Sequence, residues 1–329
     1  LLEEEEKKRV KGTIINKFRG DVSILKPGLR MLEEKINTSV LGVIPYFHLD
    51  IEDEDSLTER FRKKSRSGLA KIAVIRLPRI SNFTDIAPLE AVDELDVSYV
   101  SNISQFGDPD VVIIPGSKNT ISDLLWMRQN GLEGKILRHA AKGGIVFGIC
   151  GGYQMLGQSI SDPTGAEQKG TVRGMGLLPV TTVFEQEKRR TRVSGRFAKV
   201  GGALAEMSGV CYEGYEIHMG RTVLSKGTVP LVYMEEEGEQ RQDGAQSDHV
   251  YGCYMHGIFD MSETVKTFLA AVLRKKGIDP SKITVRDRNA YKEEQYDRLA
   301  SIVRENLNME AVYKIIEKGN EASCSLLSE

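Results

Sequence analysis

The sequence predicts an α/β fold in which helices flank an open, mostly parallel sheet. Two observations carry this prediction. Between residues 71 and 160, apolar runs alternate with amphipathic segments, which is the pattern of consecutive strand–helix units. The runs are also apolar almost throughout, as in KIAVIRLP at 71–78 and VVIIPGS at 111–117. Strands of this kind are buried on both faces, and a parallel sheet covered by helices buries them in that way.

The expected elements follow in chain order. In the central stretch we predict strands over 71–78, 97–102, 111–117 and 145–150, and helices over 83–95, 121–131 and 152–160. Upstream, a strand over 11–20, a helix from Pro27 to residue 36 and a strand over 39–47 form a β–α–β unit. Residues 171–260 are β-rich, with charged stretches at 185–192 and 235–243 as hairpin tips.

Two helices should follow the β-rich region. Each presents an apolar face, made of Val265, Phe268, Leu269 and Val272 in the first and of Leu299, Ile302, Val303 and Leu307 in the second. Residues 50–68 lack apolar periodicity and carry a run of acids followed by bases, which indicates a solvated linker near a domain boundary.

Composition excludes several classes of protein. The chain has 45 Lys and Arg against 47 Asp and Glu, a formal net charge of −2, so it lacks the cationic excess of a nucleic-acid or membrane-surface binder. No apolar run approaches the roughly 18 residues of a membrane span, and the N-terminal LLEEEEKKRV is acidic where a signal peptide is basic. The 4 Cys show no zinc spacing. These features predict a cytoplasmic protein without a structural metal.

The strongest chemical motif is IVFGICGGYQMLG at 145–157. A strand runs directly into G-x-C-G-G and then into a helix, which is the pattern of a nucleophile elbow. Small residues on both sides of Cys150 let the chain turn sharply and raise the thiol above the sheet edge. We therefore predict that Cys150 is a nucleophile at a helix N-terminus, a position that favours a thiolate; the alternative is a small buried Cys in a tight turn.

A cysteine nucleophile needs a base, and the chain has five His, at 48, 139, 218, 249 and 256. His256 ends an apolar strand and precedes a glycine, and strand ends are where α/β active sites collect. His218 is the second candidate, on the same strand face as Glu216. His139 and His249 are expected at the surface, and Cys253, pointing away from His256, is expected in the core.

Acyl transfer through a thioester also needs an oxyanion hole. The backbone N–H of Gly151, directly after the nucleophile, would supply one donor. Gly116, in the Pro-Gly turn that ends the strand before it, would supply the second, although such a turn is also common without any function.

These motifs together resemble a known family. The order PGSKNT, GICGGYQMLG, GYEIHMG and GCYMHGIFD resembles the glutaminase part of the cobyric acid synthase family, which consists of Cys-His glutamine amidotransferases fused to a dethiobiotin-synthetase-like ATP-binding domain. The resemblance runs from about 11 to 318. GTIINKFRGD and VLGVIPYF resemble the end of that P-loop α/β domain. The implied fold of the main part is a class I (Cys-His) glutamine amidotransferase-like open sheet flanked by helices.

The resemblance implies a domain division and a set of roles. Residues 1–66 would be the remnant of the ATP-binding domain plus linker, 67–275 the amidotransferase domain, and 276–329 a helical extension and tail. Glutamine would form a thioester at Cys150 with His256 as base, and Gln154 would contact glutamine. Ammonia would amidate carboxylates of adenosylcobyrinic acid a,c-diamide, a corrinoid, at a site that uses ATP and Mg. Asn16 resembles a nucleotide-base contact, while the glutaminase part would bind no cofactor.

Two features depart from related amidotransferases. Many read H-x-E at the base, but here Ile258 stands at the position of that Glu. Either a Cys-His dyad suffices here, or Glu216 or a backbone carbonyl orients His256 instead. The chain also contains no phosphate loop of the form G-x-x-x-x-G-K-[ST], and we expect it to be the C-terminal part of a longer enzyme.

Three other functions remain open from the sequence. The acceptor could instead be cobyrinic acid or a cell-wall lipid, because the glutaminase motifs do not define it. The domain could be a non-catalytic binding module, or a Cys hydrolase of unrelated substrate.

Overall fold

The protein is described by a computed structural model that covers residues 2–47, 49, 68–236, 239–282 and 288–325. The chain forms two compact units. The larger unit spans 53–288, and the smaller unit combines 1–52 with 289–329. This grouping places the C-terminal helices with the N-terminal segment, whereas the sequence had grouped 276–329 apart as an extension of the amidotransferase domain.

The larger unit is built around a six-stranded sheet in the order β13-β14-β6-β5-β3-β4. All neighbouring strands are parallel except β13, which is antiparallel to β14. The strands are β3 (Ala70–Ile75), β4 (Leu95–Val100), β5 (Val111–Ile114), β6 (Ile145–Ile149), β13 (Ala245–Ser247) and β14 (Val250–Cys253). The predicted α/β sheet is therefore confirmed.

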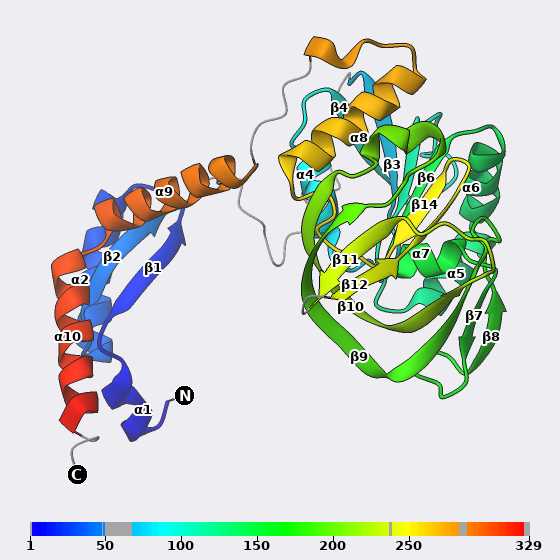
Figure 1. Ribbon diagram of the computed structural model, residues 1–329. Coiled ribbons are helices and arrows are strands. Elements are labelled where there is room, and N and C mark those ends of the chain that lie inside the picture. Colours follow the sequence, from blue (N-terminus) through cyan, green and yellow to red (C-terminus); the bar gives the residue numbers. More distant parts are fainter. Residues whose placement is uncertain (1, 48, 50–67, 237–238, 283–287, 326–329) are drawn as a thin grey trace. The chain divides into compact units, whose positions relative to one another are not determined.

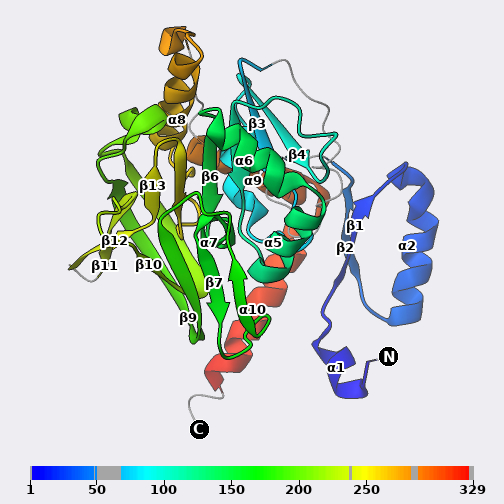
Figure 2. The same cartoon turned by 90° about the vertical axis from the view of Figure 1, so that its right-hand side faces the viewer.

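Helices cover both faces of this sheet (Figures 1 and 2). The helices α5 (Thr120–Gln129), α6 (Leu132–Ala141) and α7 (Gly151–Leu156) lie on one face. The short helix α4 (Ala87–Glu90) and α8 (Ser262–Lys275) lie on the other. The predicted apolar face of α8 is confirmed, because all four of its residues are buried. Among the described residues, no helix has both the length and the apolar character that a membrane crossing requires.

A second sheet packs beside the first in the larger unit. Its strands run in the order β12-β11-β9-β7-β8, and β10 pairs with β9. The strands are β7 (Ser159–Asp162), β8 (Gly170–Arg173), β9 (Val180–Phe197), β10 (Cys211–Leu224), β11 (Val232–Glu236) and β12 (Glu239–Asp243). A 3₁₀ helix, η2 (Gly202–Met207), links β9 to β10, and η3 (Pro280–Lys282) follows α8.

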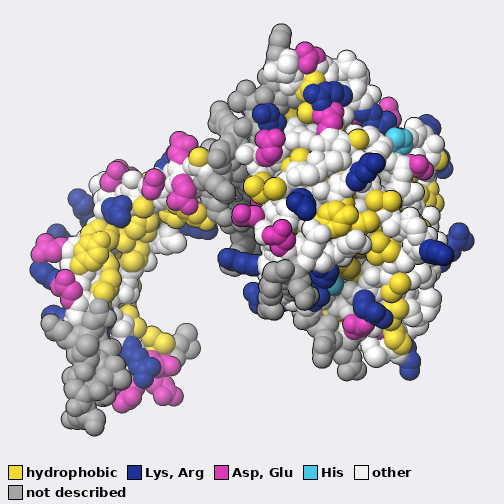
Figure 3. Space-filling view, viewed as in Figure 1, with side chains coloured by type: hydrophobic (Ala, Val, Ile, Leu, Met, Phe, Trp, Pro, Cys, Tyr) yellow, Lys and Arg dark blue, Asp and Glu magenta, His cyan; other side chains and the backbone are white. Residues whose placement is uncertain are grey.

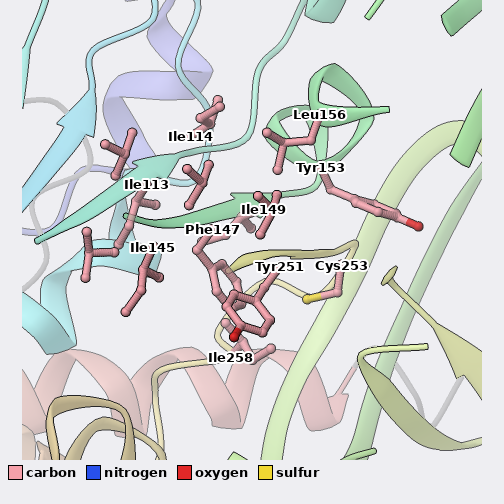
Figure 4. Close-up of a cluster of buried hydrophobic side chains, with 14 of the residues drawn as sticks. Ile113, Ile114, Ile145, Phe147, Ile149, Tyr153, Leu156, Tyr251, Cys253 and Ile258 are labelled. Carbon is pink, nitrogen blue, oxygen red and sulfur yellow. The ribbon is translucent and has the colours of Figure 1, made fainter. Parts of the chain in front are cut away.

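The core lies between the central sheet and its helices. Figure 4 shows Ile113, Ile114, Phe147 and Ile149 of β5 and β6 packed with Tyr251 and Cys253 of β14. The rings of Phe147, Phe259 and Phe268 continue the cluster toward α8, with centroids 5.4 and 5.1 Å apart in succession. Cys253 is fully buried here, as the sequence predicted.

The smaller unit pairs β1 (Thr13–Phe18) and β2 (Val40–Pro45) in parallel around α2 (Val22–Ile36). Its other helices are α1 (Glu4–Arg9), α9 (Arg288–Asn306) and α10 (Met309–Ser325). The backbone N–H of Asn308 donates to the carbonyl of Leu41 at 2.7 Å, which joins the C-terminal helices to β2. Of the described apolar residues in this unit, only Val43 and Ile44 are buried, and Figure 3 shows hydrophobic side chains grouped on its surface.

Two predicted helices differ from the structure. The segment 83–95 is a 3₁₀ turn, η1 (Phe83–Ile86), followed by the single turn α4 and a non-helical end. Pro88 in the first turn of α4 and the left-handed Asn82 ahead of η1 break the expected longer helix. In contrast, α2 begins before Pro27, because Asp21 caps it by accepting a hydrogen bond from the N–H of Ser23 at 2.7 Å.

The two predicted hairpin tips also have different outcomes. The stretch 235–243 does form a hairpin, because β11 pairs with β12 up to Glu236 and Glu239. The stretch 185–192 lies instead within the long strand β9. In the pairing of β10 with β9, His218 lies opposite Arg189, and Gly220 lies opposite Phe184. β9 therefore has more residues than β10 between these two pairs, and it forms a bulge where a turn was expected. The predicted linker at 50–68 lies almost wholly outside the described residues.

A glycine pair offers a test of the packing around α7. A Cβ added at Gly152 would lie 1.9 Å from the carbonyl oxygen of Ile114, whereas one at Gly134 in α6 would meet nothing within 4 Å. We expect Gly152→Ala to lower the free energy of unfolding by at least about 2 kcal/mol through overpacking. Gly134→Ala should raise it by about 0.5–1 kcal/mol, because alanine favours a helix interior. Chemical denaturation of both variants measures this, and equal stabilities would contradict the packing.

Candidate active site

Cys150 stands at a sharp turn between β6 and α7. Its backbone has φ 51° and ψ −107°, a left-handed conformation that a non-glycine residue adopts only under strain. Its backbone N–H donates to the carbonyl of Cys253 at 2.8 Å, which ties the turn to β14. The strand–turn–helix context predicted for a nucleophile elbow is present, and the residue is 7% exposed.

His256 follows β14 and lies beside this thiol. Its ring hydrogen-bonds with the side chain of Cys150 and is 1% exposed. The backbone of His256 exchanges two hydrogen bonds with Tyr215 of β10, at 2.9 and 3.1 Å. The ring of Tyr215 also stacks on the imidazole, with centroids 5.2 Å apart and planes inclined by 22°. Tyr215 accepts a hydrogen bond from the side chain of Asn82 at 2.8 Å. These contacts fix both the backbone and the ring of His256.

A residue that the sequence did not single out completes the arrangement. Nδ1 of His256 hydrogen-bonds with Oδ2 of Asp85 at 2.7 Å, and the other carboxylate oxygen accepts the N–H of Gly257 at 2.9 Å. Asp85 is 2% exposed and lies in η1. No local pattern identifies it, because it lies 171 residues before His256 within a segment expected to be a helix. The group that orients His256 is therefore Asp85, and the expectation of Glu216 or a backbone carbonyl was wrong.

The electrostatics of His256 follow from these partners. Burial alone would lower its pKa, but hydrogen bonds with Asp85 and Cys150 and the charges of both raise the pKa from 6.5 to about 10. The ring therefore carries a proton at neutral pH. With Nδ1–H directed at Asp85, the other ring nitrogen can hold a proton toward the sulfur and stabilise a thiolate.

The glycines predicted for an oxyanion hole lie around the same pair. A Cβ on Gly116 would be 3.1 Å from Cε1 of His256, and a Cβ on Gly151 would be 2.9 Å from the backbone nitrogen of Ser117. The turn that carries Gly116 is held by Ser117, whose hydroxyl donates to the buried carboxylate of Asp123 at 2.7 Å. Gly116 therefore lies beside the ring of His256, and Gly151 directly follows Cys150; their role as oxyanion-hole donors stays a prediction.

Gln154 lies one turn into α7 and is 2% exposed. Its amide oxygen accepts the hydroxyl of Thr120 at 3.2 Å, and its amide nitrogen donates to Tyr254 at 3.0 Å. Tyr254 also shares a hydrogen bond with Thr222 of β10 at 2.6 Å. The side chain of Gln154 therefore links α7 to Tyr254, and through Tyr254 to Thr222 of β10.

Glu216 and His218 share one face of β10, as predicted, but they belong to a different cluster. Glu216 is fully buried and pairs with Arg189, at 3.1 Å, and with Arg241. Burial alone would raise its pKa, but the neighbouring His218, Arg241 and Arg189 outweigh burial and lower it. The ring of His218 stacks on Tyr254 with centroids 3.7 Å apart. His218 is thus separated from the Cys150–His256 pair by Tyr254, and His256 is the histidine in contact with Cys150.

The remaining predicted sites are dispersed. His139 is half-buried and hydrogen-bonds with the carbonyl of Ile145 at 3.1 Å, so its expected surface position was wrong; burial lowers its pKa. His249 is half-buried as well. Asn16 is exposed on β1 of the smaller unit. Across the part of the chain that the structure describes, no group of three or more His, Cys, Asp or Glu is arranged to hold a metal ion.

The Asp85–His256 bond makes a prediction about pH. We expect Asp85→Asn to lower the pKa of His256 well below about 10, because it removes the neighbouring charge. Protonated His256 stabilises the folded wild type fully below pH 6.5, and this contribution is lost as the pH rises through about 10; in the variant the loss begins at lower pH. NMR titration of the ring and the pH profile of Cys150 alkylation measure the shift.

The control for that experiment is Asp108→Asn, an exposed acid in the loop between β4 and β5. It should leave the His256 titration unchanged. A titration of His256 that is the same in Asp85→Asn and in the wild type would show that Asp85 does not set its protonation.

Comparison with known proteins identifies the family of the chain. Residues 71–264 match the family model described as the CobB/CobQ-like glutamine amidotransferase domain. A cobyric acid synthase of Ruminiclostridium cellulolyticum is 55% identical over 325 residues, which cover 98% of this chain and 63% of that protein. One from Lachnoclostridium phytofermentans is 46% identical, over 97% of this chain and 65% of its own length.

Among solved structures, PurLQS from Thermotoga maritima aligns with 63% of this chain and 99% of its own at 17% identity, with a TM-score of 0.48. The chain spans less than two thirds of the length of the two cobyric acid synthases. The elbow and the residues around it lie inside the matched region. The chain belongs to the CobB/CobQ-like glutamine amidotransferase family.

Proposed function

We propose that the larger unit hydrolyses glutamine through a thioester at Cys150. The observation that carries this proposal is the continuous set of contacts from Asp85 through His256 to a cysteine held at a strained strand–helix turn. A nucleophile, a base in contact with it and a group that orients the base are the parts that covalent acyl transfer requires.

The geometry supports the following sequence of steps. The thiolate of Cys150 attacks the side-chain amide carbon of glutamine, and the oxygen that becomes negative is stabilised by the N–H groups of Gly116 and Gly151. When the tetrahedral intermediate collapses, the C–N bond breaks and His256 gives its proton to the leaving nitrogen, which departs as ammonia. A glutamyl thioester remains on Cys150.

Hydrolysis of the thioester reverses the role of His256. The neutral ring takes a proton from a water molecule, and the resulting hydroxide attacks the thioester carbon. The C–S bond then breaks, which releases glutamate and restores the thiolate beside the protonated ring. Asp85 remains ionised throughout and holds the ring in one orientation, as the acid of a Ser-His-Asp triad does. Gln154 is the predicted glutamine contact, and its bonds to Thr120 and Tyr254 keep that wall of the site in place.

We further propose that the ammonia serves corrinoid amidation in cobalamin biosynthesis. The relatives quoted above are cobyric acid synthases, and the resemblance implies side-chain carboxylates of adenosylcobyrinic acid a,c-diamide as acceptors. Such a ligation would use ATP with Mg. The present chain contains no phosphate-loop sequence, so its own residues do not fit the triphosphate. Asn16 of the smaller unit stays a predicted base contact.

The glutaminase proposal is tested by removing the nucleophile. Cys150→Ala should reduce ammonia release from glutamine to background, because no thioester can form. The matched control is Cys211→Ser, which changes an exposed cysteine at the start of β10 and should keep the wild-type rate. Equal ammonia release by Cys150→Ala and the wild type would refute the proposal.

The acceptor is tested separately. A protein extended to the length of the cobyric acid synthases should consume ATP only when glutamine and a corrinoid carboxylic acid are both present. Mass spectrometry should then show the corrinoid losing 1 Da for each carboxylate converted to a carboxamide, which is an exchange of OH for NH₂. ATP consumption that is indifferent to the corrinoid would assign the ammonia to another acceptor.

A further inference from the structure

The imidazole of His256 lies in a closed circuit of side chains. Its Nδ1 is bonded to Asp85, and one face of the ring is stacked on Tyr215. The hydroxyl of Tyr215 accepts a hydrogen bond from the side-chain amide of Asn82 at 2.8 Å. The backbone carbonyl of Asn82 accepts the N–H of Asp85 at 3.0 Å, which closes the circuit. The turn at η1 therefore contacts His256 twice, directly through Asp85 and indirectly through Asn82 and Tyr215.

The main chain brings Tyr215 to the imidazole. Tyr215 lies opposite His256 in an isolated antiparallel bridge between β10 and the segment that follows β14. A Cβ added to Gly214 would lie 2.1 Å from the carbonyl oxygen of His256, so the two segments are in direct contact. Tyr215 is half-buried, whereas His256 is 1% exposed. The aromatic ring is thus held at its backbone end by the bridge and at its hydroxyl end by Asn82.

Asn82 has an unusual backbone conformation for its position before η1. Its φ is 51° and its ψ is 44°, in the left-handed region that asparagine tolerates better than most residues other than glycine. A residue at this position commonly caps the helix with its side chain, but Asn82 makes no such hydrogen bond. Its amide donates instead to Tyr215, 133 residues further along the chain. The amide is therefore directed at the phenol and not at its own helix.

An aromatic ring stacked on a histidine distinguishes the two protonation states of that histidine. The negative face of the ring attracts a cation that lies within about 6 Å of its centroid, and here the centroids are 5.2 Å apart. The phenol itself remains neutral, because burial and the charge of Asp85 raise the pKa of Tyr215 to about 12. The ionisable groups bonded to the imidazole are Asp85 and Cys150, and Asp260 is a further acid near the phenol. Tyr215 thus adds an uncharged aromatic face to a site that otherwise holds the imidazole through acids.

We propose that Tyr215, held by Asn82, is a positioning residue that stabilises the protonated form of His256. The stacked phenol favours the imidazolium over the neutral ring, and it keeps the plane of the imidazole in line with both Asp85 and Cys150. The proton stabilised in this way is the one that His256 gives to the leaving nitrogen. This inference rests on the proposed glutaminase function, and it assigns a role to two residues outside the Asp85–His256–Cys150 set.

The titrations of the imidazole and of the thiol test the proposal separately. Tyr215→Leu removes the aromatic face, so the acid dissociation constant of His256 should rise about 3- to 30-fold. The thiol of Cys150 loses its proton beside an imidazolium in the wild type and in the variant, so its dissociation constant should change less than about twofold. NMR titration of His256 measures the first constant. The pH dependence of iodoacetamide alkylation, read by mass spectrometry from the peptide that contains Cys150, measures the second.

Two milder variants remove only the hydrogen bond. Tyr215→Phe keeps the aromatic face, and Asn82→Gly removes the amide but keeps a residue that adopts the left-handed backbone without strain. Each should change the titration of His256 less than Tyr215→Leu does. The double variant should change it no further than the single variants, because all three lack the same bond. These variants also keep the proposal testable if Tyr215→Leu folds poorly, which thermal unfolding reports.

The matched controls are Tyr233→Leu and Asn37→Gly. Tyr233 is another half-buried tyrosine of the same sheet, on β11, and Asn37 is another left-handed asparagine, after α2 in the smaller unit. Both variants should give the wild-type titrations of His256 and Cys150.

The outcomes separate this inference from the glutaminase proposal. A change in the titration of His256 alone, largest in Tyr215→Leu, supports the role of Tyr215. An unchanged titration of His256 in Tyr215→Leu overturns that role. A comparable change in both titrations also overturns it, because separation of the ring from the thiol would produce that result. Neither titration requires turnover, so a wild type that releases no ammonia but shows the selective change overturns the glutaminase proposal alone.

Discussion

The turn at Cys150 is the constraint on which the rest of the larger unit depends. A left-handed cysteine is strained by about 1–3 kcal/mol, and it persists only if the surrounding structure holds it. Two contacts keep the cysteine in this conformation. The helix α7 lies so close to β5 that Gly152 has no room for a Cβ, and the N–H of Cys150 donates a hydrogen bond to the carbonyl of Cys253 in β14. The buried aliphatic strands therefore do more than stabilise the fold, because they fix the direction of one thiol.

Asp85 connects this turn to a distant part of the chain. A buried carboxylate is tolerated only when its oxygens are bonded, and here both are: one to the ring of His256 and one to the N–H of Gly257. The same requirement explains the local structure around it. A regular helix over 83–95 was expected, but η1 is a tight turn next to Pro88, and this turn places the carboxylate under the strand end that carries His256.

The contrast between Cys150 and Asp85 shows which parts of this structure can be predicted from the sequence and which cannot. The strands and the sharp turn at Cys150 depend on residues adjacent in the chain, so periodicity and the glycines around Cys150 were sufficient to predict them. Asp85 and the bulge of β9 depend on contacts between segments far apart, and no local pattern encodes them. Glu216 was misjudged for a related reason, since alternation gave its strand face correctly but could not give the arginines that pair with it.

β10 connects the Cys150–His256 pair with the buried charged cluster around Glu216, because this one strand contacts both. Its backbone exchanges two hydrogen bonds with His256 at Tyr215, and the carbonyl oxygen of Ile217 lies 3.7 Å from Sγ of Cys150. Between these two residues, the side chain of Glu216 pairs with Arg189 and Arg241. Because alternate residues of a strand point to opposite faces, the backbone of β10 fixes the position of His256 relative to the ion pairs of Glu216. A change in the register of β10 would therefore move the ring of His256 away from both Asp85 and Cys150.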